Sequence, residues 1–302
     1  MSLQYIHVAE EHTWNPSRNN NMSRRRLLVT GATGTIATRI LPDLAERYDL
    51  VLLDVKSTDR EGNTVEGVIE ADLLDRNRDN YRSHFEGVDA VLHCAFIQDG
   101  HFDYYDPDRF WMENDNVRMA YNVMQVCQEA DVRRLVVMSS NHASDYYEHL
   151  IWGDKMEFVT PEMIPLSDNF YGWAKVSYES LGFVFACGGA GGRKLQNVHL
   201  RIGGPRETDI DNCGTDLKKM HRALGAYLSV RDEVQLIVKS IETDDIEDAN
   251  GIPFHAFYGI SGNTHRFWSI QNARDVIGYS PEDDSAVRFA DKIQVITNAA
   301  TE

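Results

Sequence analysis

Short apolar runs recur along the chain, and most of them end in a polar residue or a glycine. A short apolar run bounded by turn residues is typical of a strand that is buried on both faces. We expect strands of this kind at 27–29, 51–53, 68–71, 90–93, 135–138, 197–200 and 253–258.

Between the runs, apolar residues recur at the spacing of an amphipathic helix. Ile36, Ile40 and Leu44 show this spacing after the first run, and further helices are expected over 114–130 and 170–186. Strands that alternate with helices form βαβ units, which build a parallel sheet covered by helices on both faces. The predicted fold class is therefore α/β, a Rossmann-type doubly wound parallel sheet.

The pattern also divides the chain into regions. Residues 1–25 are polar and without periodicity, which predicts a flexible extension. Residues 26–200 carry the strand–helix alternation of the Rossmann domain. After Arg201 the rhythm changes, so we expect residues 201–302 to form mainly a small C-terminal substrate-binding cap, interleaved with the Rossmann domain.

Composition and charge exclude several classes of protein. The 302 residues contain 30 Lys and Arg against 47 Asp and Glu, a net charge of −17, which argues against nucleic-acid or membrane-surface partners. No apolar run reaches the roughly 18 residues of a membrane span and no signal peptide opens the chain, so we expect a cytoplasmic protein. The four cysteines form no CxxC pair, so neither a metal site nor a disulfide framework is expected.

A glycine motif follows the first predicted strand and opens the first predicted helix. Gly31 permits the tight turn, and Gly34 lets the backbone approach a pyrophosphate at the helix N-terminus. Asp54 ends the second strand, 23 residues beyond Gly31, where a carboxylate accepts hydrogen bonds from an adenosine ribose. The same carboxylate would repel a 2′-phosphate, so NAD is favoured over NADP. Lys56 and Arg60 lie close enough in sequence to leave NADP open.

Tyr171 and Lys175 are four residues apart on a predicted helix and therefore share one face. A nearby ammonium stabilises a phenolate, so we expect Lys175 to lower the pKa of Tyr171 and make the phenol a usable base. Ser140 follows the strand at 135–138, at the end where open α/β sheets bind their ligands. We expect the three side chains to act together at that edge.

In combination these motifs resemble the extended short-chain dehydrogenases/reductases, a family that contains NAD-dependent sugar epimerases and dehydratases. The resemblance covers residues 30–284. It implies that Tyr171 takes the proton of a substrate hydroxyl while hydride leaves for NAD, that Ser140 holds the substrate oxygen, and that Lys175 binds the nicotinamide ribose. It also implies a proton relay through Asn116. Further residues that it places at the cofactor are Thr35, Ile36, Asp72, Leu73, Cys94, Ala95, Phe96, Asn116 and Ile202.

Within that family, residues 139–142 and 222–229 are similar to segments of the uronate dehydrogenases and related sugar dehydrogenases. Enzymes of this type oxidise the anomeric C1 hydroxyl of a sugar acid to a lactone, and the resemblance implies that Arg222 clamps the carboxylate of such a substrate. It also implies a homo-oligomer, a dimer or larger, built on the helices at 114–130 and 170–186. The implied substrate-binding residues are Gln98, Ser140, Asn141, His142, Gly204 and Arg222.

Several features depart from the family pattern and leave the identity of the sugar open. Gln98 and Gly204 stand where the uronate enzymes place small hydroxyl residues, and three segments look longer than usual. These segments are 99–113, 145–169 and 208–219. Residues 99–168 hold 14 acidic side chains against 5 basic ones, so an anionic uronate would approach against a negative field, whereas a neutral sugar would not.

Two other functions stay open from the sequence. One is a nucleotide-sugar epimerase or dehydratase that retains its NAD through the cycle, although the small cap disfavours a bulky nucleotide substrate. The other is a non-catalytic NAD-binding sensor. The presence of Ser140, Tyr171 and Lys175 argues against a sensor, which has no need of all three.

Overall fold

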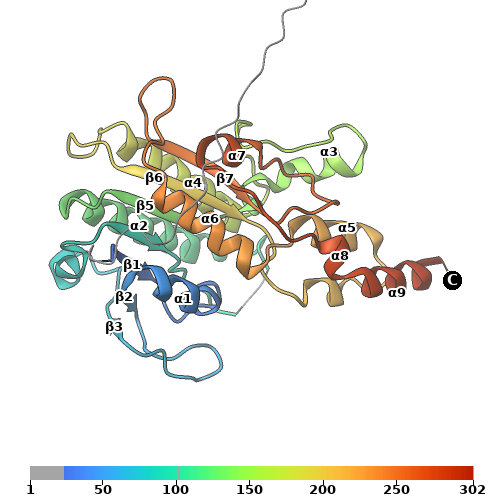
Figure 1. Ribbon diagram of the computed structural model, residues 1–302, viewed down its shortest axis with the longest axis horizontal. Coiled ribbons are helices and arrows are strands. Elements are labelled where there is room, and N and C mark those ends of the chain that lie inside the picture. The colour runs from blue at the N-terminus through green and yellow to red at the C-terminus, as the bar shows by residue number, and fades with distance from the viewer. Residues whose placement is uncertain (1–23, 101–102, 302) are drawn as a thin grey trace, which may run out of the picture.

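A parallel sheet forms the centre of the molecule (Figure 1). The computed structural model describes residues 24–100 and 103–301, so the extension predicted over 1–25 lies almost entirely outside the described residues. Within the described ranges the sheet has seven strands in the order β3-β2-β1-β4-β5-β6-β7, all parallel. They are β1 (Arg26–Thr30), β2 (Asp49–Asp54), β3 (Val68–Glu70), β4 (Ala90–His93), β5 (Arg134–Ser140), β6 (Gln196–Ile202) and β7 (Phe254–Gly259).

Helices cover both faces of the sheet, as the doubly wound prediction requires (Figure 1). The helices are α1 (Thr35–Arg47), α2 (Arg109–Glu129), α3 (Glu148–Trp152), α4 (Phe170–Ala186), α5 (Leu217–Ala226), α6 (Val230–Glu242), α7 (Gln271–Ile277), α8 (Ser285–Arg288) and α9 (Ala290–Thr301). Leu44 of α1 and Ile237 of α6 share one buried apolar cluster, whereas Val123 of α2 and Tyr178 of α4 share a second one. The predicted α/β fold class is confirmed.

None of the helices in the described ranges has the length and hydropathy that a membrane span needs.

The structure corrects two predicted boundaries. Ser139 and Ser140 belong to β5 rather than to the turn after it, because they continue the pairing with Arg201 and Ile202 of β6. Helix α2 begins at Arg109, within the segment that the sequence sets apart as an insertion. The apolar pattern does not reveal this start, because the buried positions there are the charged Arg109 and Glu113, which form an ion pair with Nε and Oε1 3.0 Å apart.

A buried ion pair joins α4 to the sheet. Arg201 of β6 donates to both carboxylate oxygens of Glu179, at 2.9 Å from Nε and 2.7 Å from Nη2. The hydroxyl of Ser139 on β5 donates to the same carboxylate at 2.9 Å. One carboxylate therefore ties the helix to two neighbouring strands.

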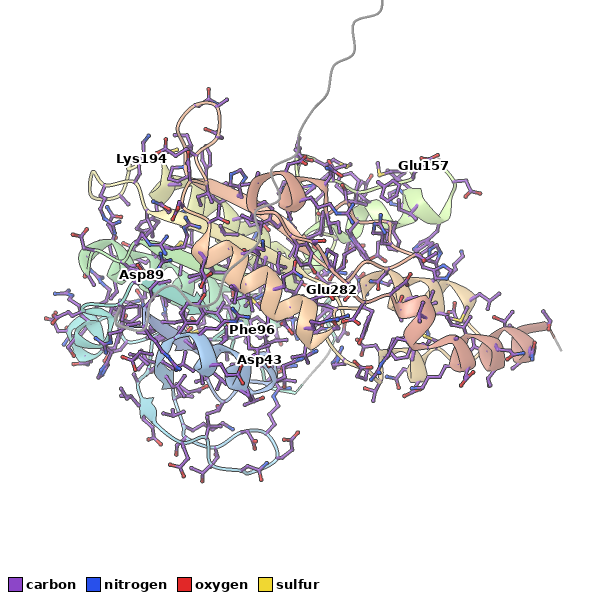
Figure 2. All side chains as sticks on the ribbon, viewed as in Figure 1. Asp43, Asp89, Phe96, Glu157, Lys194 and Glu282 are labelled. Atoms are coloured by element: carbon purple, nitrogen blue, oxygen red, sulfur yellow. The ribbon has the colours of Figure 1, made fainter. Side chains whose placement is uncertain are left out.

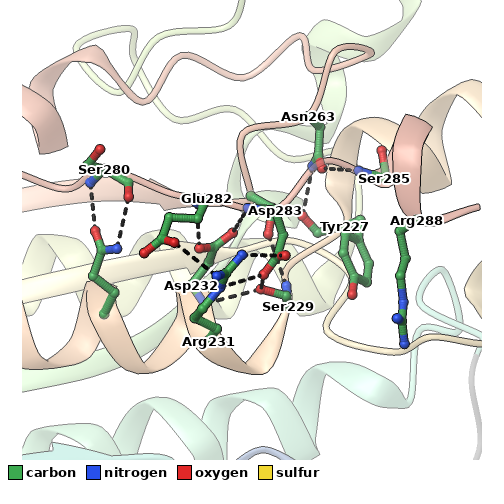
Figure 3. Close-up of polar contacts among 12 residues, drawn as sticks. Tyr227, Ser229, Arg231, Asp232, Asn263, Ser280, Glu282, Asp283, Ser285 and Arg288 are labelled. Atoms are coloured by element: carbon green, nitrogen blue, oxygen red, sulfur yellow. Dashed lines mark hydrogen bonds and ion pairs between the residues drawn. The ribbon is translucent and has the colours of Figure 1, made fainter.

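The C-terminal region combines sheet and cap. Strand β7 and helix α6 complete the central layers. Helices α5, α8 and α9, which form the cap, lie together at one end of the molecule (Figure 1). Polar contacts attach the cap to the start of α6 (Figure 3). Arg231 bonds to Asp283 at 2.7 Å, and Ser229 donates to the same carboxylate at 2.6 Å. The Asn263 amide donates to Tyr227 O at 2.8 Å and accepts from Ser285 N at 3.1 Å.

We predict that Glu179→Gln lowers the free energy of unfolding by about 3 kcal/mol, because the change leaves Arg201 charged and buried without its partner. Urea denaturation measures this loss. The matched control is Glu282→Gln, which breaks an ion pair with Arg231 whose side chains are 59% and 54% exposed. The control should leave the stability nearly unchanged. Equal losses in the two variants would contradict the structural role of Glu179.

Candidate active site

The loops that follow β1 and β4 meet where the strand order reverses, at the carboxyl edge of the sheet. Gly31 adopts a φ of +68°, and a Cβ at this position would lie 2.5 Å from both Cα and N of Ala95. Only glycine fits there. The close approach leaves two backbone loops side by side at the point where open α/β sheets bind ligands.

The N-terminus of α1 and the end of β2 complete this part of the site. Gly34 precedes the helix, no side chain of the described residues caps the first turn, and that turn holds no acidic residue. The carboxylate of Asp54 accepts from the Thr33 backbone at 2.9 Å and from its hydroxyl at 2.8 Å, which places it beside the glycine turn. A helix N-terminus with free N–H groups and a nearby carboxylate suits a pyrophosphate and a ribose. These residues therefore fit a dinucleotide.

The other residues predicted at the cofactor lie on the same edge. Thr35 and Ile36 open α1, Asp72 and Leu73 follow β3, Cys94 to Phe96 follow β4, and Ile202 ends β6. Their individual contacts with a cofactor stay predictions.

The structure brings Ser140, Tyr171 and Lys175 together. Ser140 ends β5, Tyr171 lies in the first turn of α4, and Lys175 lies in the next turn. A Cβ on Gly172 would lie 2.1 Å from the His142 carbonyl oxygen, so the helix packs directly against the loop after β5. The Tyr171 ring consequently lies 5.3 Å from the ring of His142, between centroids.

Phe96 links this group to the glycine loop. Its ring lies edge-on to Tyr171, with centroids 5.4 Å apart, and the Lys175 Nζ is 4.5 Å from its centre. Phe96 lies near the middle of the molecule in Figure 2. The predicted cofactor and catalytic residues therefore share one edge of the sheet.

Burial controls the protonation of the two catalytic candidates. It lowers the pKa of Lys175 to about 8, against the opposing effect of Glu113. It also raises the pKa of the Tyr171 phenol, although a hydrogen bond with Ser140 lowers that pKa in part. The net shift is therefore opposite to the lowered pKa that the sequence predicts, because desolvation of the phenol dominates. The Lys175 Nζ donates to Met138 O, 3.3 Å away, and its own effect on the Tyr171 pKa stays a prediction.

Asn116 connects α2 to the loop after β4. Its side chain accepts from Ile97 N at 2.7 Å and donates to Ile97 O at 3.2 Å and to Glu113 Oε2 at 3.3 Å. The predicted relay through Asn116 stays a prediction; the contacts in the structure hold the loop in place.

A cavity of about 340 Å³ adjoins the Tyr171 group. Its lining consists of Tyr104, Tyr105, His142, Asp145, Tyr146, Glu148, His149, Trp152, Asp168, Asn169 and Arg222. His142 and Arg222 were predicted to bind substrate, and both lie on its wall. Asn141, also predicted, is buried beside Ser140, and its amide nitrogen has no hydrogen-bond partner among the described residues.

The remaining two predicted substrate residues lie elsewhere. Gln98 accepts a hydrogen bond from Arg60, on the loop after β2, at 2.5 Å. Gly204 donates its backbone N–H to Ala226 O at 2.7 Å and accepts from Leu228 N at 3.1 Å. Neither residue is part of the described cavity wall, and their roles toward a substrate stay predictions.

The segments at 99–113 and 145–169 supply residues that the sequence did not identify. Tyr104 stacks on the ring of Tyr171, with centroids 5.0 Å apart and planes 18° apart. Asp145 bonds to the His142 Nδ1 at 2.5 Å, and Glu148 bonds to Arg222 at 2.9 Å. The one signal in the sequence was the richness of these segments in aromatic and acidic residues.

Residues 27–182 match the NAD dependent epimerase/dehydratase family. The chain belongs to this family. Membership confirms the resemblance inferred from the motifs, the prediction of an NAD-dependent enzyme, and NAD as its cofactor.

Individual relatives extend over most of the chain. The NAD-dependent glucose-6-phosphate dehydrogenase of Haloferax volcanii is 28% identical and covers 86% of this chain and 94% of its own. The L-arabinose 1-dehydrogenase (NAD(P)(+)) of the same organism is 28% identical, with 86% and 98% covered. The crystal structure of uronate dehydrogenase from Agrobacterium tumefaciens matches the fold with a TM-score of 0.69 at 24% identity, over 91% of this chain and 90% of that one.

We predict that Gly31→Ala weakens NAD binding at least about tenfold, because the new Cβ would overlap the backbone of Ala95 and displace the two loops. Calorimetric titration with NAD measures the change. Gly87→Ala is the matched control: its φ is also +68°, but a Cβ there meets only the tip of the Arg26 side chain, at 3.6 Å. Gly87 precedes β4, at the opposite edge of the sheet. Equal loss of NAD affinity in the control would assign the effect to backbone strain instead.

Proposed function

We propose that this protein is a sugar dehydrogenase that oxidises the hydroxyl at the anomeric carbon, C1, to a lactone with NAD. The observation that carries the proposal is the convergence of Ser140, Tyr171 and Lys175 beside the glycine loop, next to a cavity of the size of a small ligand. The names of the relatives, which act on glucose 6-phosphate and L-arabinose, support a sugar as substrate.

The cofactor residues divide into those for the pyrophosphate and those for the riboses. The N-terminus of α1, from Thr35, and the Gly31 turn would hold the pyrophosphate. Asp54 would accept from the adenosine ribose, and Lys175 would hold the nicotinamide ribose. NAD, when bound, supplies the hydride acceptor.

Tyr171 receives the proton in the proposed reaction. The O–H and C–H bonds at C1 break and a C=O bond forms; two electrons leave with the hydride, and the proton passes to the Tyr171 oxygen. The Ser140 hydroxyl would hold the substrate oxygen together with the Asn141 amide nitrogen, which has no hydrogen-bond partner among the described residues. The ammonium of Lys175, close to the ring at 5.4 Å from its centre, would stabilise the phenolate form that accepts the proton.

A homodimer through α2 and α4 is part of the proposal. Large apolar side chains are exposed on both helices, including Trp111 and Tyr121 of α2 and Phe183 and Val184 of α4. These two helices pack against each other on one face of the sheet. Exposed apolar side chains on two adjacent helices support an interface between copies.

We predict net formation of NADH when the protein is mixed with added NAD and a free sugar from a panel of aldoses, uronic acids and UDP-sugars. Absorbance at the NADH band measures it. Turnover of a UDP-sugar without net NADH would contradict the dehydrogenase and favour an epimerase. No turnover on the whole panel would favour the NAD-binding sensor.

We predict that Tyr171→Phe lowers kcat by at least about a hundredfold, because the variant loses the group that accepts the proton. NAD binding, measured by calorimetry, should remain within about twofold of wild type, since the ring contacts with Phe96 and Tyr104 are kept. Tyr178→Phe provides the control: Tyr178 lies one turn beyond Lys175, is fully buried, and its hydroxyl has no hydrogen-bond partner in the described structure. Full activity of Tyr171→Phe would overturn the mechanism.

A further inference from the structure

Arg222 is held by the protein's own carboxylates. Its Nε lies 2.9 Å from each carboxylate oxygen of Glu148, and its Nη2 lies 3.5 Å from Asp145 Oδ1. The exposed fraction of the side chain is 31% for Arg222, 15% for Glu148 and 11% for Asp145. The guanidinium that the family resemblance would assign to a substrate carboxylate is therefore engaged inside the cavity wall.

An anionic ligand would have to displace Glu148 to bind this guanidinium. The displaced carboxylate would stay largely buried beside Asp145, without a cation. Removing one partner of a buried, hydrogen-bonded charge pair is strongly unfavourable, because the remaining charge is left unpaired. The existing pair therefore opposes a substrate carboxylate or phosphate at this position.

The rest of the wall adds to this opposition. Among its described residues, the carboxylates of Asp145, Glu148 and Asp168 outnumber the single guanidinium. Asp145 cannot turn away readily, since it accepts from Asn169 at 2.8 Å and bonds to His142. A negatively charged ligand would enter against this local field.

The same wall suits an uncharged sugar. Carboxylate oxygens accept hydrogen bonds, and each sugar hydroxyl has a proton to donate. The rings of Tyr105, Tyr146 and Trp152 supply apolar surface for the C–H faces of a pyranose. A neutral sugar can bond to Glu148 and Asp145 while their contacts with Arg222 stay in place.

We propose that Glu148 is a specificity-determining residue: by occupying Arg222 it makes the cavity accept neutral aldoses and reject uronic acids and phosphorylated sugars. This inference rests on the proposed function, since it names the substrate class of the same site.

The test compares kcat/KM for galactose, galacturonate and glucose 6-phosphate, with NAD, in wild type and two variants. Wild type should prefer galactose over both anions by more than about tenfold. Glu148→Gln frees Arg222 and should shift the galacturonate-to-galactose ratio at least about tenfold toward galacturonate. Glu157→Gln removes the same charge from an exposed position of the same segment, at the edge of the molecule (Figure 2), and should not change the ratio.

A double variant and a binding measurement complete the design. Adding Arg222→Met to Glu148→Gln should remove the gain toward galacturonate. If the gain came only from the lower overall negative charge, it would remain in the double variant. Calorimetric titration with galacturonate should show tighter binding to Glu148→Gln than to wild type, whether or not turnover occurs.

The outcomes separate the two proposals. An unchanged ratio in Glu148→Gln, or a gain that survives Arg222→Met, overturns the role of Glu148 and leaves the dehydrogenase intact. Equal kcat/KM of the wild type for galacturonate and galactose also overturns the role of Glu148 and leaves the dehydrogenase intact. This outcome does not require the variant to fold. Absence of NADH with every sugar contradicts the proposed function, and the galacturonate titration then decides whether Glu148 blocks Arg222.

Discussion

The buried pair of Glu179 and Arg201 is the constraint on which the site depends. Tyr171, Lys175 and Glu179 follow one another at intervals of four residues along α4, so they share one face of the helix. Because Glu179 is tied to Arg201 on β6 and Ser139 on β5, the rotation and height of α4 on the sheet are set at one end of this face. The other two residues are thereby directed at the end of β5, where Ser140 lies.

Much of the fold and of the cofactor half could be predicted because its signals are local. Gly31 and Asp54 belong to a strand–turn–helix pattern of fixed spacing, and Tyr171 and Lys175 are one helical turn apart. Ser140 was assigned correctly to the sheet edge but to the wrong element, since its strand pairing depends on Ile202, 62 residues away in the sequence. The start of α2 was missed because its buried positions are charged.

The substrate half could not be predicted to the same degree, because its contacts join segments with no common period. Tyr104 reaches Tyr171 from a loop 67 residues earlier in the chain, and Glu148 meets Arg222 across 74 residues. Spacing carries no information at such separations. The acidic surplus of residues 99–168 is explained in part by this wall, where Asp145, Glu148 and Asp168 line the cavity.

The close approach of Gly31 to Ala95 has a consequence for how the molecule can change. The backbones of Gly31 and Ala95 meet directly at this contact, so a side chain introduced at position 31 would push the two loops apart. Glu148 and Arg222, in contrast, meet only through their side chains. Replacements in the cavity can therefore change which substrate the protein acts on, while the dinucleotide half stays as it is. The cofactor half and the substrate half of the active site can therefore evolve separately, although both lie at the carboxyl edge of a single sheet.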